Sequence, residues 1–156
     1  MDEAGRAPLA GPVVAAAVIL DTEIRIAGLD DSKLLPREER ERLFVLIQSR
    51  AVAALQVTPE LVLTDFVRLA GLDCPQRNLV RGDQRSATVA AASIVAKVTR
   101  DRLMEEADGA FPVYGFRRHK GYPTREHREA LERHGPCPLH RRTFQGVSTQ
   151  MGLFTV

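Results

Sequence analysis

DEAGRAPLAGPVVAAAVIL, residues 2–20, is the stretch that decides the fold. Residues 13–20 are rich in valine, alanine and isoleucine and follow a Gly-Pro pair, which predicts a β-strand. Two adjacent carboxylates, Asp2 and Glu3, open the stretch that leads into this strand. Carboxylate oxygens are ligands that Mg²⁺ prefers, and a strand edge holds them rigidly. An isolated Asp-Glu pair is more often solvated surface, so a metal site here depends on the rest of the chain.

Helices and strands are intermixed beyond this stretch, so the predicted fold class is α/β. The longest helix is predicted over residues 84–108, which contain no glycine or proline. Ala91, Ile94 and Val98 form its apolar face, and Arg100 falls on another face. The other predicted elements are a helix over about 36–54, a strand over 60–65, an extended piece over 78–80 and a helix over 124–134 that is capped by Thr124.

Length and composition predict one globular domain, because 156 residues with 44% hydrophobic content can form a core. The net charge is only +2, but residues 117–142 hold eight arginines and lysines against three glutamates. This segment is either a nucleic-acid-binding surface or a solvated helix face with i,i+4 ion pairs.

Cysteine and hydropathy patterns indicate a cytoplasmic protein. Cys74 and Cys137 are too few for a disulfide framework, and the apolar run 12–20 is too short to span a membrane. We therefore expect reduced thiols and no membrane partner. His134, Cys137 and His140 have a spacing close to that of zinc ligands, but no fourth ligand matches it, so we assign no zinc site.

Four carboxylates stand at predicted strand ends or turns. Such groups repel each other strongly unless cations neutralise them, so their convergence would imply a metal site. Two Mg²⁺ ions held in this way activate a water and stabilise the leaving oxygen of a phosphodiester. Sequence spacing alone leaves open whether the side chains meet. The four residues are Asp2, Glu3, Asp65 and Asp83.

Six stretches, in order along nearly the whole chain, resemble the motifs of ribonuclease HII, a family that cuts RNA within RNA–DNA hybrids. Chance does not produce six ordered matches of this length. The stretches are DEAGRAPLAGPVVAAAVIL (2–20), GLDDSKLL (28–35), LVLTD (61–65), VRGDQRSATVAAASIVAKVTRDRLM (80–104), YGFRRHKGYPT (114–124) and GPCPLHRRTF (135–144).

The resemblance implies a ribonuclease H-like fold, a mixed sheet flanked by helices with a helical C-terminal region. It implies a single domain, with a catalytic core over about 1–110 and a basic helical region over about 111–156. It implies that Asp2, Glu3, Asp65 and Asp83 are the catalytic metal ligands for Mg²⁺ or Mn²⁺, in a two-metal mechanism. The ribose 2′-hydroxyl would be read by the turn Gly5, Arg6, Ala7 and by Tyr122, and Lys33 would lie near the cleaved phosphate.

The implied activity is hydrolysis of the RNA strand of hybrids, including ribonucleotides embedded in duplex DNA, which leaves 5′-phosphate and 3′-hydroxyl ends. The expected partner is this duplex, bound by a monomer. Three departures favour an alternative, a catalytically weak or inactive hybrid-binding protein. Ala7 and Phe66 replace glycines of the family, and roughly thirty residues, a strand and a helix, are missing between Arg50 and Leu61, which would expose a sheet edge.

Overall fold

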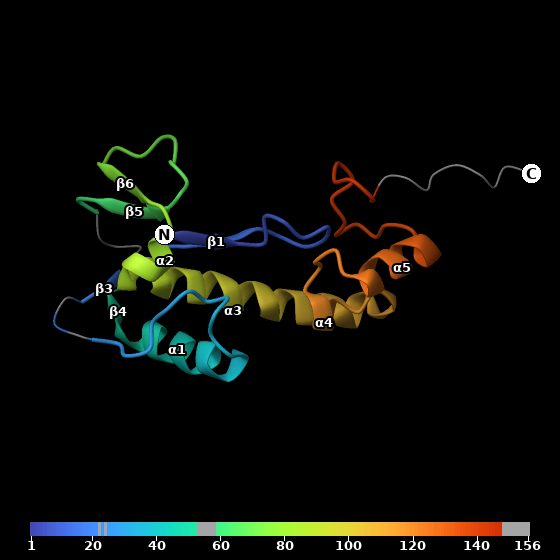
Figure 1. The fold of residues 1–156 in the computed structure, drawn as a ribbon, viewed down its shortest axis with the longest axis horizontal. Helices are drawn as coiled ribbons and strands as arrows, with labels where there is room; N and C mark the ends of the chain where they lie inside the picture. Colours follow the sequence, from blue (N-terminus) through green and yellow to red (C-terminus); the bar gives the residue numbers. More distant parts are fainter. Residues whose placement is uncertain (22, 24, 53–58, 148–156) are drawn as a thin grey trace, which may run out of the picture. The chain divides into compact units, whose positions relative to one another are not determined.

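The computed structural model describes residues 1–21, 23, 25–52 and 59–147 (Figure 1). The chain divides into two compact units. The first contains Met1–Ala4 and Val14–Thr99, and the second contains Gly5–Val13 and the chain from Arg100 onward. The boundary falls inside the longest helix, α3 (Ala87–Ala110). A single domain with a catalytic core over about 1–110 therefore stays a prediction.

The described strands of the first unit form three two-stranded sheets, two of them antiparallel and one parallel. Hydrogen bonds link the start of the chain to β5, because the Met1 ammonium donates to the Leu63 carbonyl at 2.7 Å and the Asp65 N–H donates to the Met1 carbonyl at 3.3 Å. The pairs are β1 (Asp2–Ala4) antiparallel to β2 (Val14–Ala16), β3 (Ile19–Leu20) antiparallel to β4 (Ala51–Val52), and β5 (Val62–Asp65) parallel to β6 (Gln76–Leu79).

The strand predicted over 13–20 is in fact two short strands, β2 and β3. They pair with different partners: β2 lies against β1, and β3 lies against β4. Valine and isoleucine favour extended backbone throughout the stretch, but the change of partner interrupts the ladder. The prediction was correct in type and wrong in continuity.

Helix α1 (Arg37–Arg50) ends earlier than the predicted helix over about 36–54. Ala51 takes an extended conformation, with φ −70° and ψ 136°, and begins β4, while residues 53 and 54 lie outside the described part of the chain. The helix packs beside the first half of α3, as Figure 1 shows. Their shared core contains Leu43, Phe44, Ile47, Ala91, Ala92, Ile94 and Val98.

The helix predicted over 84–108 is interrupted at Ser86, whose backbone is extended at φ −138° and ψ 119°. A short helix, α2 (Gly82–Arg85), precedes the break and α3 follows it. No glycine or proline marks the break, so the sequence pattern could not reveal it. Its consequence is that Asp83 belongs to α2 and not to the long helix.

The second unit has its own core and its own short helices. Helix α5 (Arg125–His134) begins as predicted, because the Thr124 side chain accepts a hydrogen bond from the His127 N–H at 3.2 Å. A 3₁₀ turn (Pro112–Tyr114) and helix α4 (Phe116–His119) were not predicted. The buried core residues are Leu9, Ala10, Met104, Tyr114, Phe116, Ala130, Leu131, Cys137 and Val147.

Both cysteines are free thiols; Cys74 is partly buried and Cys137 is buried. Across the described ranges, no helix combines the length and the apolar character that crossing a bilayer requires.

Phe66, directly after β5, has a strained backbone. Its φ is 60°, in the left-handed region, and the residue is 72% exposed, so burial offsets little of the strain. A side chain in this region costs about 1–2 kcal/mol per residue. We expect Phe66→Gly to be more stable than Phe66→Ala by about 1 kcal/mol, because both remove the ring and only glycine removes the Cβ. Urea denaturation of the two variants measures the difference, and equal stabilities would contradict the strain.

Candidate functional site

Three of the four predicted acids meet in the first unit. Asp2 comes from β1, Asp65 from the end of β5 and Asp83 from α2. One carboxylate oxygen of each lies within 4.8 Å of the others. These residues are up to 81 positions apart in the chain, so only the fold brings them together. We call this group the three-carboxylate cluster.

Gly82 explains how Asp83 reaches Asp65. The Gly82 N–H donates to Oδ1 of Asp65 at 2.8 Å, which ties the start of α2 to the end of β5. A Cβ on Gly82 would lie 3.2 Å from both the Leu79 Cβ and the Val89 Cγ1, tighter than ordinary packing. Glycine therefore allows the close approach that places Asp83 in the cluster.

The electrostatics of the cluster favour a bound cation. The pKa of Asp2 is raised to about 6, first by burial and also by the charges of Asp65, Glu3 and Asp83, while the hydrogen bond from the Glu3 N–H acts in the opposite direction. The pKa of Asp83 is also raised, first by burial and then by the charges of Asp31 and Asp65. Crowded carboxylates with raised pKa values and hard oxygen donors fit a divalent metal such as Mg²⁺ or Mn²⁺. The residues present thus suit the metal that the sequence predicted.

Glu3 lies outside the three-carboxylate cluster. Adjacent residues of a strand point to opposite faces, so Asp2 and Glu3 on β1 are directed differently. Glu3 does line a small cavity of about 50 Å³ together with Asp2 and Asp65. Its assignment as a metal ligand stays a prediction.

Asp31 is a buried acid near the cluster that sequence reasoning missed. Its charge and a side-chain hydrogen bond both act on Asp83. Oδ1 of Asp31 accepts the Lys33 N–H at 2.9 Å, and the positive charge of Lys33 acts on Asp83 in the opposite direction. The structure therefore places the predicted Lys33 close enough to influence the cluster. The signal in the sequence was a second acid in the motif DDSK, residues 30–33.

The predicted ribose-reading turn belongs to the second unit and is held by Arg141. Its guanidinium donates to the carbonyls of Gly5 at 2.5 Å, Arg6 at 2.8 Å and Gly11 at 2.8 Å. Gly5 has a φ of 100°, which side chains rarely adopt. Ala7 is not among the described residues with positive φ, so its Cβ introduces no backbone strain of that kind.

Arg100 connects the stretch that follows this turn with the segment that carries Tyr122. The sequence pattern placed Arg100 on a polar helix face, but it is only 1% exposed. It donates to the carbonyls of Pro12 at 3.1 Å, Ala10 at 3.2 Å and Lys120 at 2.9 Å. Its Cζ lies 5.8 Å from the centroid of the Tyr122 ring, and this tyrosine is 37% exposed. The stretch after the predicted turn and the residues next to Tyr122 thus share one buried cation.

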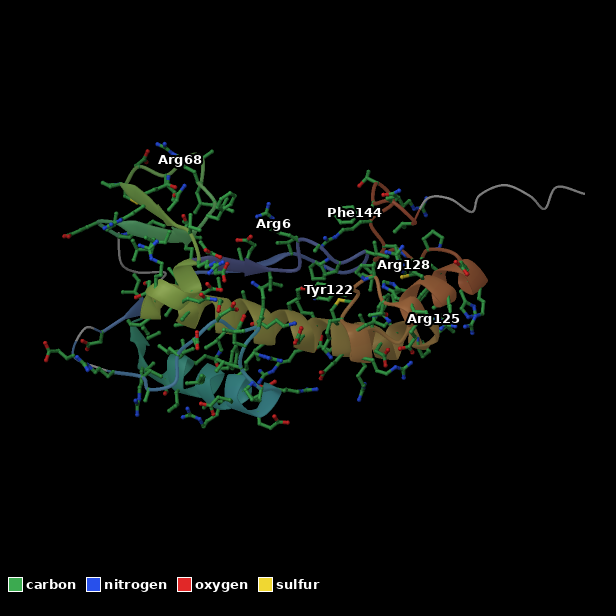
Figure 2. The ribbon with its side chains drawn as sticks, viewed as in Figure 1. Arg6, Arg68, Tyr122, Arg125, Arg128 and Phe144 are labelled. Atoms are coloured by element: carbon green, nitrogen blue, oxygen red, sulfur yellow. The ribbon has the colours of Figure 1, made fainter. Side chains whose placement is uncertain are left out.

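The basic segment 117–142 has the ion pairs expected of a solvated helix face, and its role in nucleic-acid binding stays a prediction. Several arginines form surface ion pairs, such as Arg125 with Glu129 at 2.7 Å and Arg133 with Glu129 at 3.3 Å, as on a solvated helix face. Arg128 instead donates to the Pro123 carbonyl at 3.3 Å. Figure 2 labels Tyr122, Arg125, Arg128 and Phe144, which come from the loop before α5, from α5 itself and from the segment after it.

Buried histidines occupy the centre of the second unit. Both ring nitrogens of His140 take part in hydrogen bonds, Nδ1 with the Cys137 N–H at 3.0 Å and Nε2 with His127 Nε2 at 3.0 Å. Among the described residues, the three-carboxylate cluster is the sole group of three or more potential metal ligands within reach of one another. The structure therefore gives no support to zinc at His134, Cys137 and His140.

The burial of His127 predicts that the free energy of unfolding falls in acid. It is fully buried, and burial lowers its pKa from 6.5 to about 4. A lowered pKa means that the folded state resists protonation, so the stability contribution is complete above pH 6.5 and is lost as the pH falls toward 4. We expect the free energy of unfolding to fall by about 2 kcal/mol from this residue between pH 7 and pH 5.

Urea denaturation at both pH values measures this contribution as the difference between the parent and His127→Gln. Exposed His134→Gln serves as the matched control and should keep the pH dependence of the parent. The same pH dependence in His127→Gln as in the parent would contradict the assignment.

The chain is similar in sequence to known proteins over nearly its whole length. The family model described as Ribonuclease HII matches residues 1–70 and 48–147. Ribonuclease HII of Anaeromyxobacter sp. is 48% identical, with 98% of this chain and 58% of the relative covered. Ribonuclease HII of Rhizobium meliloti is 50% identical, with 92% of this chain and 80% of the relative covered.

Solved structures agree with the fold. The ribonuclease H2 of Pyrococcus horikoshii has a TM-score of 0.80 and 25% identity, covering 94% of this chain and 93% of that one. A chain of the PCNA:RNase HII complex from Archaeoglobus fulgidus has a TM-score of 0.69 and 26% identity, covering 90% of each. The predicted fold class is confirmed.

An internal segment of the relatives is absent from this chain. The alignment with the Anaeromyxobacter protein runs over 182 positions, and 98% of 156 residues is about 153, so about 29 positions carry no residue here. The two ranges of the family match overlap at residues 48–70, which locates the gap. This agrees with the predicted loss between Arg50 and Leu61.

Proposed function

Because the chain belongs to the ribonuclease HII family of hydrolytic endoribonucleases, we propose that it cleaves the RNA strand of RNA–DNA hybrids, including single ribonucleotides embedded in duplex DNA. Cleavage on the 5′ side of the ribonucleotide would leave 3′-hydroxyl and 5′-phosphate ends. The proposed enzyme is a cytoplasmic monomer. The observation that carries the proposal is the three-carboxylate cluster, Asp2, Asp65 and Asp83, with oxygens within 4.8 Å of one another.

The roles of the residues follow from their chemistry. Asp2, Asp65 and Asp83 would hold Mg²⁺ or Mn²⁺, with Glu3 as a fourth ligand. When bound, the metal supplies an activated water and neutralises charge on the phosphate. Lys33 would offset phosphate charge beside the cluster, since its own charge already acts on Asp83.

Recognition of the ribose is assigned to the second unit. A 2′-hydroxyl is the feature that separates RNA from DNA at one nucleotide. The backbone of Gly5, Arg6 and Ala7 would approach it, since Arg141 fixes the carbonyls of this turn. Tyr122 would stack on the sugar and hydrogen-bond the hydroxyl, and the basic segment 117–142 would contact phosphates.

The testing experiment uses a labelled DNA duplex that contains one ribonucleotide. The protein is incubated with it in Mg²⁺, in Mn²⁺ or in EDTA, and the products are sized beside an all-DNA control. We expect one cut on the 5′ side of the ribonucleotide that EDTA abolishes and that the all-DNA duplex does not show. A cut that persists in EDTA would overturn the metal-dependent proposal.

A second candidate function is hybrid binding with little or no cleavage. It is favoured by the absent internal segment of about 29 positions and by Phe66, which has a φ of 60° directly beside Asp65. It predicts salt-sensitive binding of the ribonucleotide duplex without products. If restoring glycine at positions 7 and 66 then produces cleavage, the defect is local to the site. If it does not, the missing segment is responsible.

A further inference from the structure

A chain of hydrogen bonds runs through two buried histidines to the backbone of Tyr122. The Cys137 N–H lies 3.0 Å from His140 Nδ1, and His140 Nε2 lies 3.0 Å from His127 Nε2. His127 Nδ1 lies 2.9 Å from the carbonyl oxygen of Tyr122. All three contacts lie within the second unit.

The direction of this chain is determined by its first donor. A backbone N–H can only donate, so His140 Nδ1 accepts, and neutral His140 carries its proton on Nε2. His140 Nε2–H then donates to His127 Nε2, which must accept. His127 therefore carries its proton on Nδ1 and donates it to the carbonyl of Tyr122. Each bond requires the one before it, and reversing any of them would set two donors or two acceptors against each other.

A third histidine holds the other side of the same residue. The Tyr122 N–H donates to the carbonyl of His119 at 2.9 Å, and the Gly121 N–H donates to His119 Nδ1 at 3.2 Å. The His119 and His127 rings stack with centroids 4.5 Å apart. The backbone of Tyr122 is thus held at both its N–H and its carbonyl, while its side chain reaches the surface.

We propose that His127 and His140 are positioning residues that orient Tyr122 for recognition of the ribose, acting through this one-way chain of hydrogen bonds. The proposal rests on the proposed function, because it deepens the role given to Tyr122. His127 is 0% exposed, so its ring does not reach a substrate and can act only through its neighbours. Its imidazole is neutral near pH 7, as the chain requires, because burial lowers its pKa to about 4.

The first test detects the direction of the hydrogen bonds in the parent protein and requires no enzymatic activity. Nitrogen-15 NMR of the histidine rings distinguishes the two neutral tautomers. We expect His127 to be protonated on Nδ1 and His140 on Nε2, with a scalar coupling across the bond between their Nε2 atoms. His127 protonated on Nε2 would overturn the proposal.

The second test is a double-mutant cycle with Tyr122. His127→Leu removes one of the two donors to the Tyr122 carbonyl, since the Thr124 N–H also donates to it at 2.8 Å, whereas the side-chain amide of His127→Asn can replace the lost donor. We expect His127→Leu to lower kcat/KM on the ribonucleotide duplex by about 10- to 100-fold, as small misplacements do. His127→Asn should recover most of the loss, and in the Tyr122→Ala background His127→Leu should cost less than about twofold.

The same cycle is measured as Kd for the duplex in EDTA. This binding measurement gives an answer even if the parent does not cleave. Failure of the proposed function would appear as no cleavage by the parent, whereas failure of this inference would appear as an equal loss in both Tyr122 backgrounds. Such an equal loss, or no recovery by His127→Asn when thermal unfolding shows that the variant is folded, would reduce the histidines to a structural role.

Discussion

Asp83→Asn should lower the cleavage rate by at least about 1,000-fold, which corresponds to about 4 kcal/mol of lost transition-state stabilisation. The amide keeps the shape of the carboxylate but removes the charge and one strong metal-binding oxygen. The fold should survive, because burial and the charges of Asp31 and Asp65 raise the pKa of Asp83, so its ionised form is unfavourable in the metal-free protein. We expect unchanged or slightly increased thermal stability without metal.

Single-turnover cleavage of the ribonucleotide duplex measures this effect, and thermal unfolding with and without Mg²⁺ measures the fold. Asp2→Asn should lower the cleavage rate in the same way, since Asp2 belongs to the three-carboxylate cluster. Asp73→Asn is the matched control, an exposed acid outside the cluster that should retain the parent rate. Turnover by Asp83→Asn within tenfold of the parent would show that the cluster does not hold the catalytic metal.

Arg100→Met should destabilise the protein by about 3 kcal/mol, because three buried or part-buried carbonyls lose a charged donor that is itself almost completely buried. These carbonyls belong to Ala10, Pro12 and Lys120, and methionine keeps only the apolar stem of the arginine. The loss should exceed that of an ordinary surface arginine, since Arg100 is almost completely buried. Ribose recognition should weaken as well, because the stretch after the Gly5 turn and the segment before Tyr122 lose their common donor.

Urea denaturation measures the stability loss, with Arg125→Met as a control. Arg125 is an exposed helix arginine paired with Glu129, and its removal should cost less than about 0.5 kcal/mol. A loss below 1 kcal/mol for Arg100→Met would mean that the freed carbonyls find other donors. The ratio of cleavage between ribonucleotide and all-DNA duplexes reports whether recognition changes with stability.

Local patterns predicted much of the fold because they act over a few residues. The Thr124 cap and the apolar spacing of Ala91, Ile94 and Val98 each determine their own element. The break at Ser86 was invisible, since no helix-breaking residue marks it and the bond from Gly82 to Asp65 favours it from outside the segment. Division of the strand over 13–20 has the same origin, because the partner strands lie elsewhere in the chain.

Arg100 and Asp31 show what a single sequence cannot reveal about a site. Both are charged residue types that are usually exposed, so periodicity assigns them to the surface. Their surroundings come from distant segments, since three carbonyls accept hydrogen bonds from Arg100 and the Asp83 carboxyl lies beside Asp31. Such compensation arises only when the segments meet, and for that reason these two residues were missed.

The sequence by itself determined the family, the α/β class and the identity of the acids, because these depend on ordered motifs and on residue chemistry. Only the tertiary structure decided that Asp2, Asp65 and Asp83 meet while Glu3 lies outside their group. It also decided that Arg141 holds the backbone around Gly5 and that the buried His127 and His119 hold the backbone around Tyr122. The physical reason is that strand alternation and packing between distant segments set the direction of each side chain, and neither is encoded within one stretch of sequence.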